Sequence, residues 1–459
     1  MRKFFLLFGF SILTLCLQAQ NSYTNSFDRL EPAGEMPDYF KQILQKRPTN
    51  LTTSDVKLIE EKYVFSLLMN GKILYGDPLT QYLNLLLDKI LEHKPEMRKE
   101  VQIFALKSEQ VNAFSTPLGT IFVNLGLIAH CTTEAQLAFI ICHELAHYKL
   151  AHSEEKWQTN PDKIKEIDDF LKYRSLSREL ELNADKYGFI DFYKDLGYNF
   201  EAFEDVFDML QFADLPFADK QFTRNFFENE YYNFPDDYFL TQIRDITFRE
   251  NYVDTLSSHP NILNRRLEMR KIVGQFSNTN HSKTTAYFEK QFNETRLLAQ
   301  FESINQMIIK NNYLYAYYNA CALQDIYPQH PFLKQTEAAA LYALYRLKAT
   351  GNYTNNVTKS SLLPEEMQFP AALLEKMSKK EWAVYTLRTI WNALQTPQSF
   401  NPSTPQSFSP SVLQSFSPSV LQSFTPSILQ LSNPNFQRYG ERGDYAYRRL
   451  KSILRLPND

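Results

Sequence analysis

Three of the eight histidines in this chain lie in one stretch, IICHELAHYKLAH, from Ile140 to His152. Two of them, His143 and His147, are four residues apart and flank Glu144 in the pattern H-E-x-x-H. On a helix, side chains four residues apart share a face, so both imidazoles can bind a single metal ion. Glu144 can then address a water on that ion, which is the arrangement of a hydrolytic metal site.

The residues around this motif predict the helix that the site needs. Thr133 and Gln136 have the spacing of a capping box, and Glu134 falls in the first turn, where an acidic side chain is favoured. Apolar residues follow without Gly or Pro, and Cys142 is expected to be a small buried residue among them. A pair of histidines at this spacing can also be ordinary core residues. The deciding feature is therefore a third ligand.

The stretch SRELELNADKYGF, residues 177–189, contains candidates for that ligand. A catalytic zinc ion takes three protein ligands and leaves the fourth position for water. Glu181 and Asp185 lie one helical turn apart among good helix formers. If this helix packs on the first, Glu181 completes a His-His-Glu site, and Asp185 orients a ligand histidine. The alternative is that both carboxylates are solvated surface groups.

Four blocks in this order resemble the zinc metallopeptidases of family forty-eight, which include the CAAX prenyl endopeptidases and bacterial envelope proteases. The blocks are VNAFSTPLGTIFVNLGLI (Val111–Ile128), TEAQLAFIICHELAHYKLAH (Thr133–His152), SRELELNAD (Ser177–Asp185) and SSHPNILNRRLEMR (Ser257–Arg270). The resemblance implies a gluzincin-type domain with one Zn²⁺ per chain. The metal helix has Leu145-Ala146 where many relatives have Ile-Gly, a mild change. The long apolar helices of the integral-membrane relatives are absent from the sequence, so the soluble exported branch is the one it resembles.

The resemblance also implies roles for the site residues. His143, His147 and Glu181 would bind the zinc, Glu144 would be the general base, and Asp185 would accompany the third ligand. His259 in the fourth block is a candidate second electrophile for the transition state. It can equally occupy the open position of the zinc and hold the enzyme latent, or simply pack beside Pro260.

A strand is expected after the turn that runs from Thr116 to Gly119, because TIFVNL has a strand-like composition. An exposed edge at Gly119, Thr120, Ile121 and Phe122 would bind an extended polypeptide by main-chain pairing. Unfolded or loop substrates would then be favoured over folded ones. An internal strand without a role in substrate binding is the alternative.

Composition divides the chain further. Residues 1–20 have a basic start and an apolar run, which predict a secretory signal peptide; Cys16 lacks the small neighbour of a lipoprotein cysteine. Residues 21–275 mix helical and extended patterns, whereas residues 284–395 are helix-patterned. Residues 396–432 repeat a Pro/Ser-rich octapeptide and predict a disordered linker before a short basic tail, 433–459. The expected class is α+β, mostly helical, with a small sheet, without a transmembrane helix in the mature chain.

The segment 284–395 resembles tetratricopeptide repeats, with small packing residues at Ala316 and Ala320 and a closing Pro328. A plain helical bundle is the alternative. Two functions follow: a periplasmic zinc endopeptidase for unfolded or misassembled envelope proteins, or a non-proteolytic, chaperone-like assembly factor with a latent or structural zinc. In either, the repeats offer a surface for substrates or for an envelope or outer-membrane partner. The near-neutral net charge of −3 gives no reason to expect a nucleic-acid partner. Glu144 favours the peptidase, because a structural zinc site needs no base.

Overall fold

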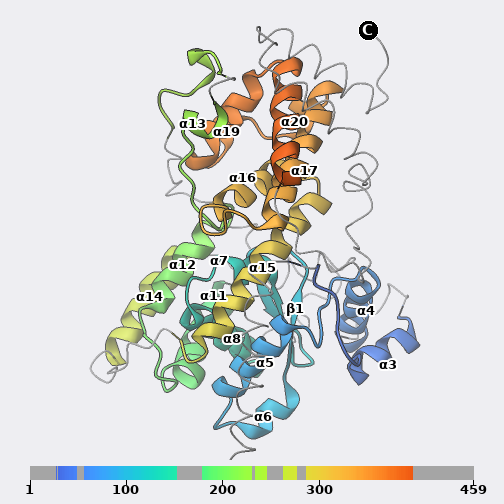
Figure 1. Ribbon diagram of the computed structural model, residues 1–459. Coiled ribbons are helices and arrows are strands. Elements are labelled where there is room, and N and C mark those ends of the chain that lie inside the picture. The colour runs from blue at the N-terminus through green and yellow to red at the C-terminus, as the bar shows by residue number, and fades with distance from the viewer. Residues whose placement is uncertain are drawn as a thin grey trace, which may run out of the picture. The chain divides into compact units, whose positions relative to one another are not determined.

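The computed structural model describes residues 27, 29–48, 56–151, 178–229, 233–244, 262–276 and 286–395 (Figure 1). They fall into two compact units. The metal-helix unit comprises the described parts of Leu30–Asp214 and Arg249–Ser303, and the helical unit those of Met1–Arg29, Leu215–Phe248 and Ile304–Asp459. The predicted signal peptide, octapeptide linker and basic tail lie outside the described residues, as does His259.

A small mixed sheet lies at the centre of the metal-helix unit. Its strands are β1 (Gln102–Leu106), β2 (Ala113–Ser115) and β3 (Thr120–Asn124), in the order β1-β3-β2. The central strand β3 pairs in parallel with β1 and antiparallel with β2. Every residue of β3 is buried, as expected for the central strand of a sheet that is covered by helices. The mostly helical α+β class predicted from the sequence is confirmed.

Helices surround this sheet. They are α3 (Asp38–Lys46), α4 (Val56–Met69), α5 (Pro78–Ile90), α6 (Pro95–Glu100), α7 (Leu125–His130), α8 (Glu134–Lys149), α11 (Arg178–Gly188), α12 (Ala202–Gln211), α14 (Ile262–Phe276) and the start of α15 (Glu289–Ile309), with a π-helical turn η2 (Phe189–Tyr193) after α11. Helix α8 packs against β2, β3 and α11, and α14 packs against α11 and α12. The long central helix α8 is therefore held from several sides (Figure 1).

A buried carboxylate fixes the first turn of α8. Glu134 is fully buried and accepts hydrogen bonds from the hydroxyls of Tyr82 and Tyr198, at 2.9 and 2.7 Å. It also accepts bonds from the backbone N–H groups of Tyr287 and Phe288, just before α15. One ionised carboxylate can accept this many donors because both of its oxygens are acceptors only. Glu134 thus connects three distant parts of the chain to the metal helix.

Replacing Glu134 by Gln is expected to destabilise the protein. The amide has the same shape but carries an N–H₂ group, which would face donors that are already buried. The expected loss is about 1–3 kcal/mol in the free energy of unfolding, the cost of leaving buried polar groups unsatisfied. Urea unfolding followed by circular dichroism would measure it. Glu92→Gln, a change at an exposed residue near the end of α5, is the matched control and should leave the midpoint unchanged.

The helical unit has a core of packed helices. It contains α13 (Arg224–Phe227), η3 (Asp236–Tyr238), the end of α15, α16 (Tyr313–Leu323), α17 (Pro331–Ala349), α18 (Tyr353–Asn356), η6 (Ser360–Leu362), α19 (Glu365–Lys376) and α20 (Lys379–Gln395). Helix α17 packs on both α16 and α20, and the hydroxyls of Tyr317 and Tyr385 are 2.9 Å apart in this core. The tetratricopeptide character of residues 284–395 stays a prediction.

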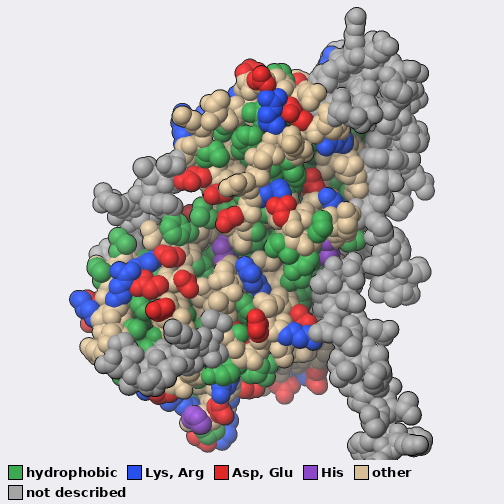
Figure 2. All heavy atoms as spheres, turned by 60° about the vertical axis from the view of Figure 1, so that its left-hand side comes forward, with side chains coloured by type: hydrophobic (Ala, Val, Ile, Leu, Met, Phe, Trp, Pro, Cys, Tyr) green, Lys and Arg blue, Asp and Glu red, His purple; other side chains and the backbone are tan. Residues whose placement is uncertain are grey.

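Charge is mixed on the surface. On the face drawn in Figure 2, acidic and basic side chains alternate over short distances instead of forming broad patches of one sign. Arg266 and Arg270 on α14, for example, pair with Glu204 and Asp208 on α12. Among the described residues, no helix is both long and apolar enough to cross a membrane.

Candidate metal centre

Helix α8 places the H-E-x-x-H motif inside the metal-helix unit. The predicted capping box is confirmed: the Thr133 hydroxyl accepts a bond from the Gln136 N–H, and the Gln136 side chain accepts one from the Thr133 N–H. The first fourteen residues of the helix, from Glu134 to His147, are all buried. Cys142 is among them, as expected, and the cysteines of the described residues are free and buried. The motif therefore lies at a depth where polar groups require partners.

A glycine brings α11 close to α8. A Cβ atom at Gly188 would lie 2.9 Å from the Cys142 carbonyl oxygen and 3.0 Å from the His143 Cα atom. Contacts this short with backbone atoms exclude any larger residue. The close approach lets short acidic side chains on α11 reach the histidines on α8.

Three buried donors converge between the two helices. The Nε2 atoms of His143 and His147 are 3.0 Å apart, and they lie 3.4 and 3.3 Å from the Glu181 carboxylate oxygens. The three residues are at most 5% exposed. Ligand atoms about 2.0–2.2 Å from a tetrahedral zinc ion lie roughly 3.3–3.6 Å from one another. The donor types fit zinc, as do the two separations from Glu181, whereas the two Nε2 atoms lie a few tenths of an ångström closer together than a bound ion would hold them.

Charged residues around the three donors hold them in position. Asp185 accepts a 2.8 Å hydrogen bond from His143 Nδ1, which directs the Nε2 lone pair of that imidazole towards the other donors. Arg265 on α14 donates two hydrogen bonds to Asp185, at 2.6 and 2.7 Å, and its Nη1 lies 3.1 Å from Glu181. Arg265 is itself buried. The two carboxylates on α11 thus share one buried cation.

The pKa values reflect this charge balance. Burial by itself lowers the pKa of His143, but hydrogen bonds and charge from Asp185 and Glu181 outweigh it and raise the pKa to about 9. Burial lowers the pKa of His147 to about 4. Burial alone would raise the pKa of Asp185, yet Arg265 holds it below its usual value. Asp185 is therefore ionised, and protons compete with a metal ion for His143.

Glu144 lies beside the three donors but makes a different contact. Its side chain is 1% exposed, and its Oε2 accepts a 2.8 Å hydrogen bond from the N–H of Ser115 on β2. The last residue of this edge strand therefore holds the carboxylate in one orientation. A fixed, buried carboxylate next to a metal site is suited to accept a proton from water.

The structure brings together five of the residues singled out from the sequence: His143, Glu144, His147, Glu181 and Asp185. The expected edge is placed differently. Thr120, Ile121 and Phe122 belong to the central strand β3, which is paired on both sides, and Gly119 uses its N–H and its carbonyl in bonds to Thr116 and Gln102. The alternative of an internal strand is thus the arrangement observed, and in the described sheet β1 and β2 are the edge strands.

Three contributors to the site were not assigned from the sequence. Arg265 lies in the fourth block, but its partners are 80 and 84 residues away and its spacing gives no indication of them. Ser115 contributes only a backbone N–H, which any residue except proline offers. Gly188 falls near the end of the stretch SRELELNADKYGF, where a glycine gives no sign of close helix packing. Four basic residues lie in α14, and their helical spacing from its buried apolar residues does not separate Arg265 from Arg266.

Comparison with known proteins shows similarity around the same elements. The profile described as "Peptidase family M48" matches residues 80–160, which include β1 to α8. This part of the chain is therefore similar to peptidase family M48. The peptidases of this family are zinc metallopeptidases, and the family resemblance is confirmed over residues 80–160, which contain the first two of the four blocks.

Individual relatives in this family are similar over short segments. The "Beta-barrel assembly-enhancing protease" of Escherichia coli (strain K12) is 30% identical over 80 residues, covering 17% of this chain and 16% of that protein. The protein of the same name from Yersinia pestis is 26% identical over 90 residues, 20% and 18% of the two chains. "Metalloendopeptidase OMA1, mitochondrial" of Bos taurus is 32% identical over 113 residues, 19% and 22%. The similarity thus spans about a fifth of the relatives' length.

Proposed function

We propose that this chain is an exported zinc-dependent endopeptidase that hydrolyses peptide bonds in unfolded or misassembled envelope proteins. The observation that supports it most is Glu144, a buried carboxylate beside three convergent metal donors and held by the Ser115 N–H. The similarity of residues 80–160 to M48 peptidases agrees with this chemistry. Relatives named for β-barrel assembly suggest the envelope as the place of action.

In this proposal, His143, His147 and Glu181 hold the zinc ion. When bound, zinc lowers the pKa of water and polarises a peptide carbonyl. Asp185 keeps His143 in the tautomer that presents Nε2 to the ion, and Arg265 keeps Asp185 ionised and holds Glu181 in place. The three ligands and their supports come from α8, α11 and α14, so the site depends on the packing of these helices.

Glu144 moves the proton. Its carboxylate takes a proton from the attacking water and then gives it to the leaving amine, so one group serves as base and acid. The hydrogen bond from Ser115 fixes Oε2, which limits the rotation of the carboxylate between these steps. His259 is proposed either to assist the transition state or to block the zinc site. It lies outside the described residues.

The edge strand β2 is proposed as the substrate-binding strand in place of β3. Within the described residues it lies at an edge of the sheet, pairs with β3 over Ala113–Ser115, and contacts α8. An extended polypeptide can add to such an edge through main-chain hydrogen bonds. A peptide bound there would pass next to Glu144, because Ser115 contacts its carboxylate. Binding of this kind requires an extended substrate and therefore favours unfolded proteins.

The function is tested by zinc content and by cleavage of an unfolded protein such as casein. We expect one zinc ion per chain, as the single described donor group implies, and we expect casein fragments to accumulate. Dialysis against a chelator should remove the zinc and abolish cleavage, and added zinc should restore both. Cleavage that survives metal removal would contradict the proposal.

A protein that binds zinc but cleaves nothing would favour the chaperone-like alternative, unless the site is blocked. His259→Ala distinguishes these cases: cleavage that appears in this variant indicates latency. A variant that stays inactive and still suppresses aggregation of unfolded proteins would support the assembly factor.

A further inference from the structure

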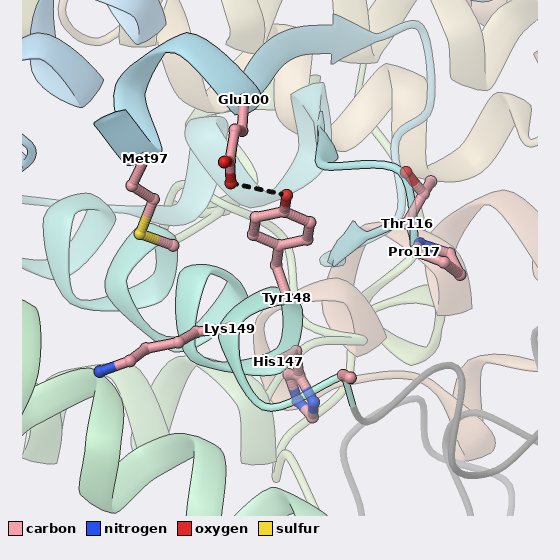
Figure 3. A pocket seen from close by; sticks show the side chains of 8 residues that line it. Met97, Glu100, Thr116, Pro117, His147, Tyr148 and Lys149 are labelled. Carbon is pink, nitrogen blue, oxygen red and sulfur yellow. Dashed lines mark hydrogen bonds between the residues drawn. The ribbon is translucent and has the colours of Figure 1, made fainter. Parts of the chain in front are cut away.

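A pocket of about 420 Å³ opens directly beside His147. Three elements form its walls: the turn between β2 and β3 (Thr116, Pro117), the end of α6 (Met97, Glu100) and the last turn of α8 (Tyr148, Lys149). Figure 3 shows these side chains around the pocket, with His147 at its lower end. Its volume is within the range of small-ligand sites, and it is ample for one long side chain of a bound peptide.

The walls of this pocket are held in place by specific contacts. The Tyr148 hydroxyl donates a 3.2 Å hydrogen bond to the Glu100 carboxylate across the pocket (Figure 3). Gly119 has a φ of +83°, and a Cβ atom there would lie 3.3 Å from the Tyr148 ring and 2.7 Å from the Glu100 carbonyl oxygen. Glycine thus lets the turn approach both residues. The pocket is a built feature of the metal-helix unit.

Glu100 is the negative charge of this pocket. The neighbouring cations are paired with other carboxylates: Arg98 with Asp88, Lys99 with Glu96, and Lys149 with Asp191. Lys149 points away from Glu100 in Figure 3. Within the described part of the chain, no Lys or Arg forms an ion pair with Glu100. A carboxylate accepts several hydrogen bonds, so the bond from Tyr148 leaves capacity for another donor.

We infer that this pocket is a subsite for a lysine or arginine side chain of the substrate, next to the cleaved bond. The inference rests on the proposed peptidase function. The aliphatic stem of the side chain would lie against Met97, Pro117 and the Tyr148 ring, and its cationic head would reach Glu100. Because the pocket lies next to His147, the lysine or arginine of the substrate would bind beside the proposed metal ligands. Glu100 thereby determines specificity without taking part in the chemistry.

Peptide binding tests the subsite separately from catalysis. Zinc-loaded Glu144→Gln protein is titrated, by fluorescence anisotropy, with fluorescein-labelled peptides that carry Lys, norleucine or Glu at one position, scanned along the peptide. Norleucine has the stem of lysine without its charge. At one position we expect Lys to bind roughly three- to fivefold more tightly than norleucine, as befits a solvent-accessible ion pair. Glu should bind most weakly there.

Variants at α6 then assign the preference to a residue. Adding Glu100→Gln should remove the preference for Lys, and adding Glu100→Lys should invert it towards Glu. Glu96→Gln, a change at an exposed residue of the same helix, should leave it intact. Equal binding of Lys and norleucine peptides, or a preference that survives Glu100→Gln, would overturn the inference. Cleavage of the same peptides by wild type tests the peptidase function independently. If Lys peptides bind preferentially but are not cleaved, the subsite is supported and the peptidase function is refuted.

Discussion

Replacing Glu144 by Gln is expected to lower kcat for casein-derived peptides by about 10²- to 10⁴-fold, the usual contribution of a general base. The amide cannot take a proton from water, although it keeps the size of the carboxylate and can still accept the hydrogen bond from Ser115. Zinc content should be unchanged, because the metal donors are His143, His147 and Glu181. Steady-state kinetics and metal analysis on the same preparation would check both expectations.

Glu179→Gln is the control for this variant. Glu179 is an exposed carboxylate in the first turn of α11, two residues from Glu181, and its replacement should leave kcat unchanged. An activity of Glu144→Gln within tenfold of wild type would show that another group accepts the proton. Loss of zinc from Glu144→Gln would instead show that this carboxylate is a ligand.

The part of the site that lies on single helices could be predicted from the sequence, because it depends only on the spacing of residues within each helix. Helical periodicity places His143 and His147 on one face, and the spacing of Thr133 and Gln136 marks where that helix begins. Glu181 and Asp185 follow the same rule on a second helix. The sequence left open whether the two helices meet, and the structure answers this with the close packing that Gly188 allows.

The remaining features depend on strand pairing and helix packing between residues far apart in the sequence, which cannot be deduced from a single sequence. The strand-like run at residues 120–124 was correctly predicted to be extended, but its central position depends on β1 and on the three-residue β2. A strand as short as β2 is nearly invisible to pattern analysis, and yet it is the edge next to Glu144. Arg265 is a similar case, since its role exists only once α14 packs on α11.

This dependence on distant packing makes α14 part of the metal centre. Its buried face supplies Arg265 to the site, and its outer face is tied to α12 by Arg266 and Arg270, which pair with Glu204. The guanidinium of Arg265 also lies over the Phe207 ring of α12, 5.3 Å from its centroid. A rigid α14 therefore fixes the position of the cation that Glu181 and Asp185 share.

Replacing Arg265 by Met is expected to destabilise the metal-free protein by about 3–5 kcal/mol, the cost of leaving buried charges without their partner. In the zinc-loaded protein the loss should be smaller, about 1–3 kcal/mol, because the ion compensates Glu181 and only the hydrogen bonds to Asp185 are missing. Zinc should therefore stabilise the variant more than it stabilises wild type. Urea unfolding with and without zinc measures all four free energies.

Two further variants give this prediction its specificity. Arg265→Lys keeps the charge but cannot form the paired hydrogen bonds to Asp185, so it should recover part of the lost stability. Arg270→Met removes an exposed guanidinium from the same helix and should leave the effect of zinc unchanged. An equal loss for Arg265→Met with and without zinc would mean that Arg265 acts through Asp185 alone. A larger loss of stability with zinc than without it would mean that Arg265 mainly stabilises the metal-bound state. Its main role would then not be to compensate the carboxylates of the metal-free protein.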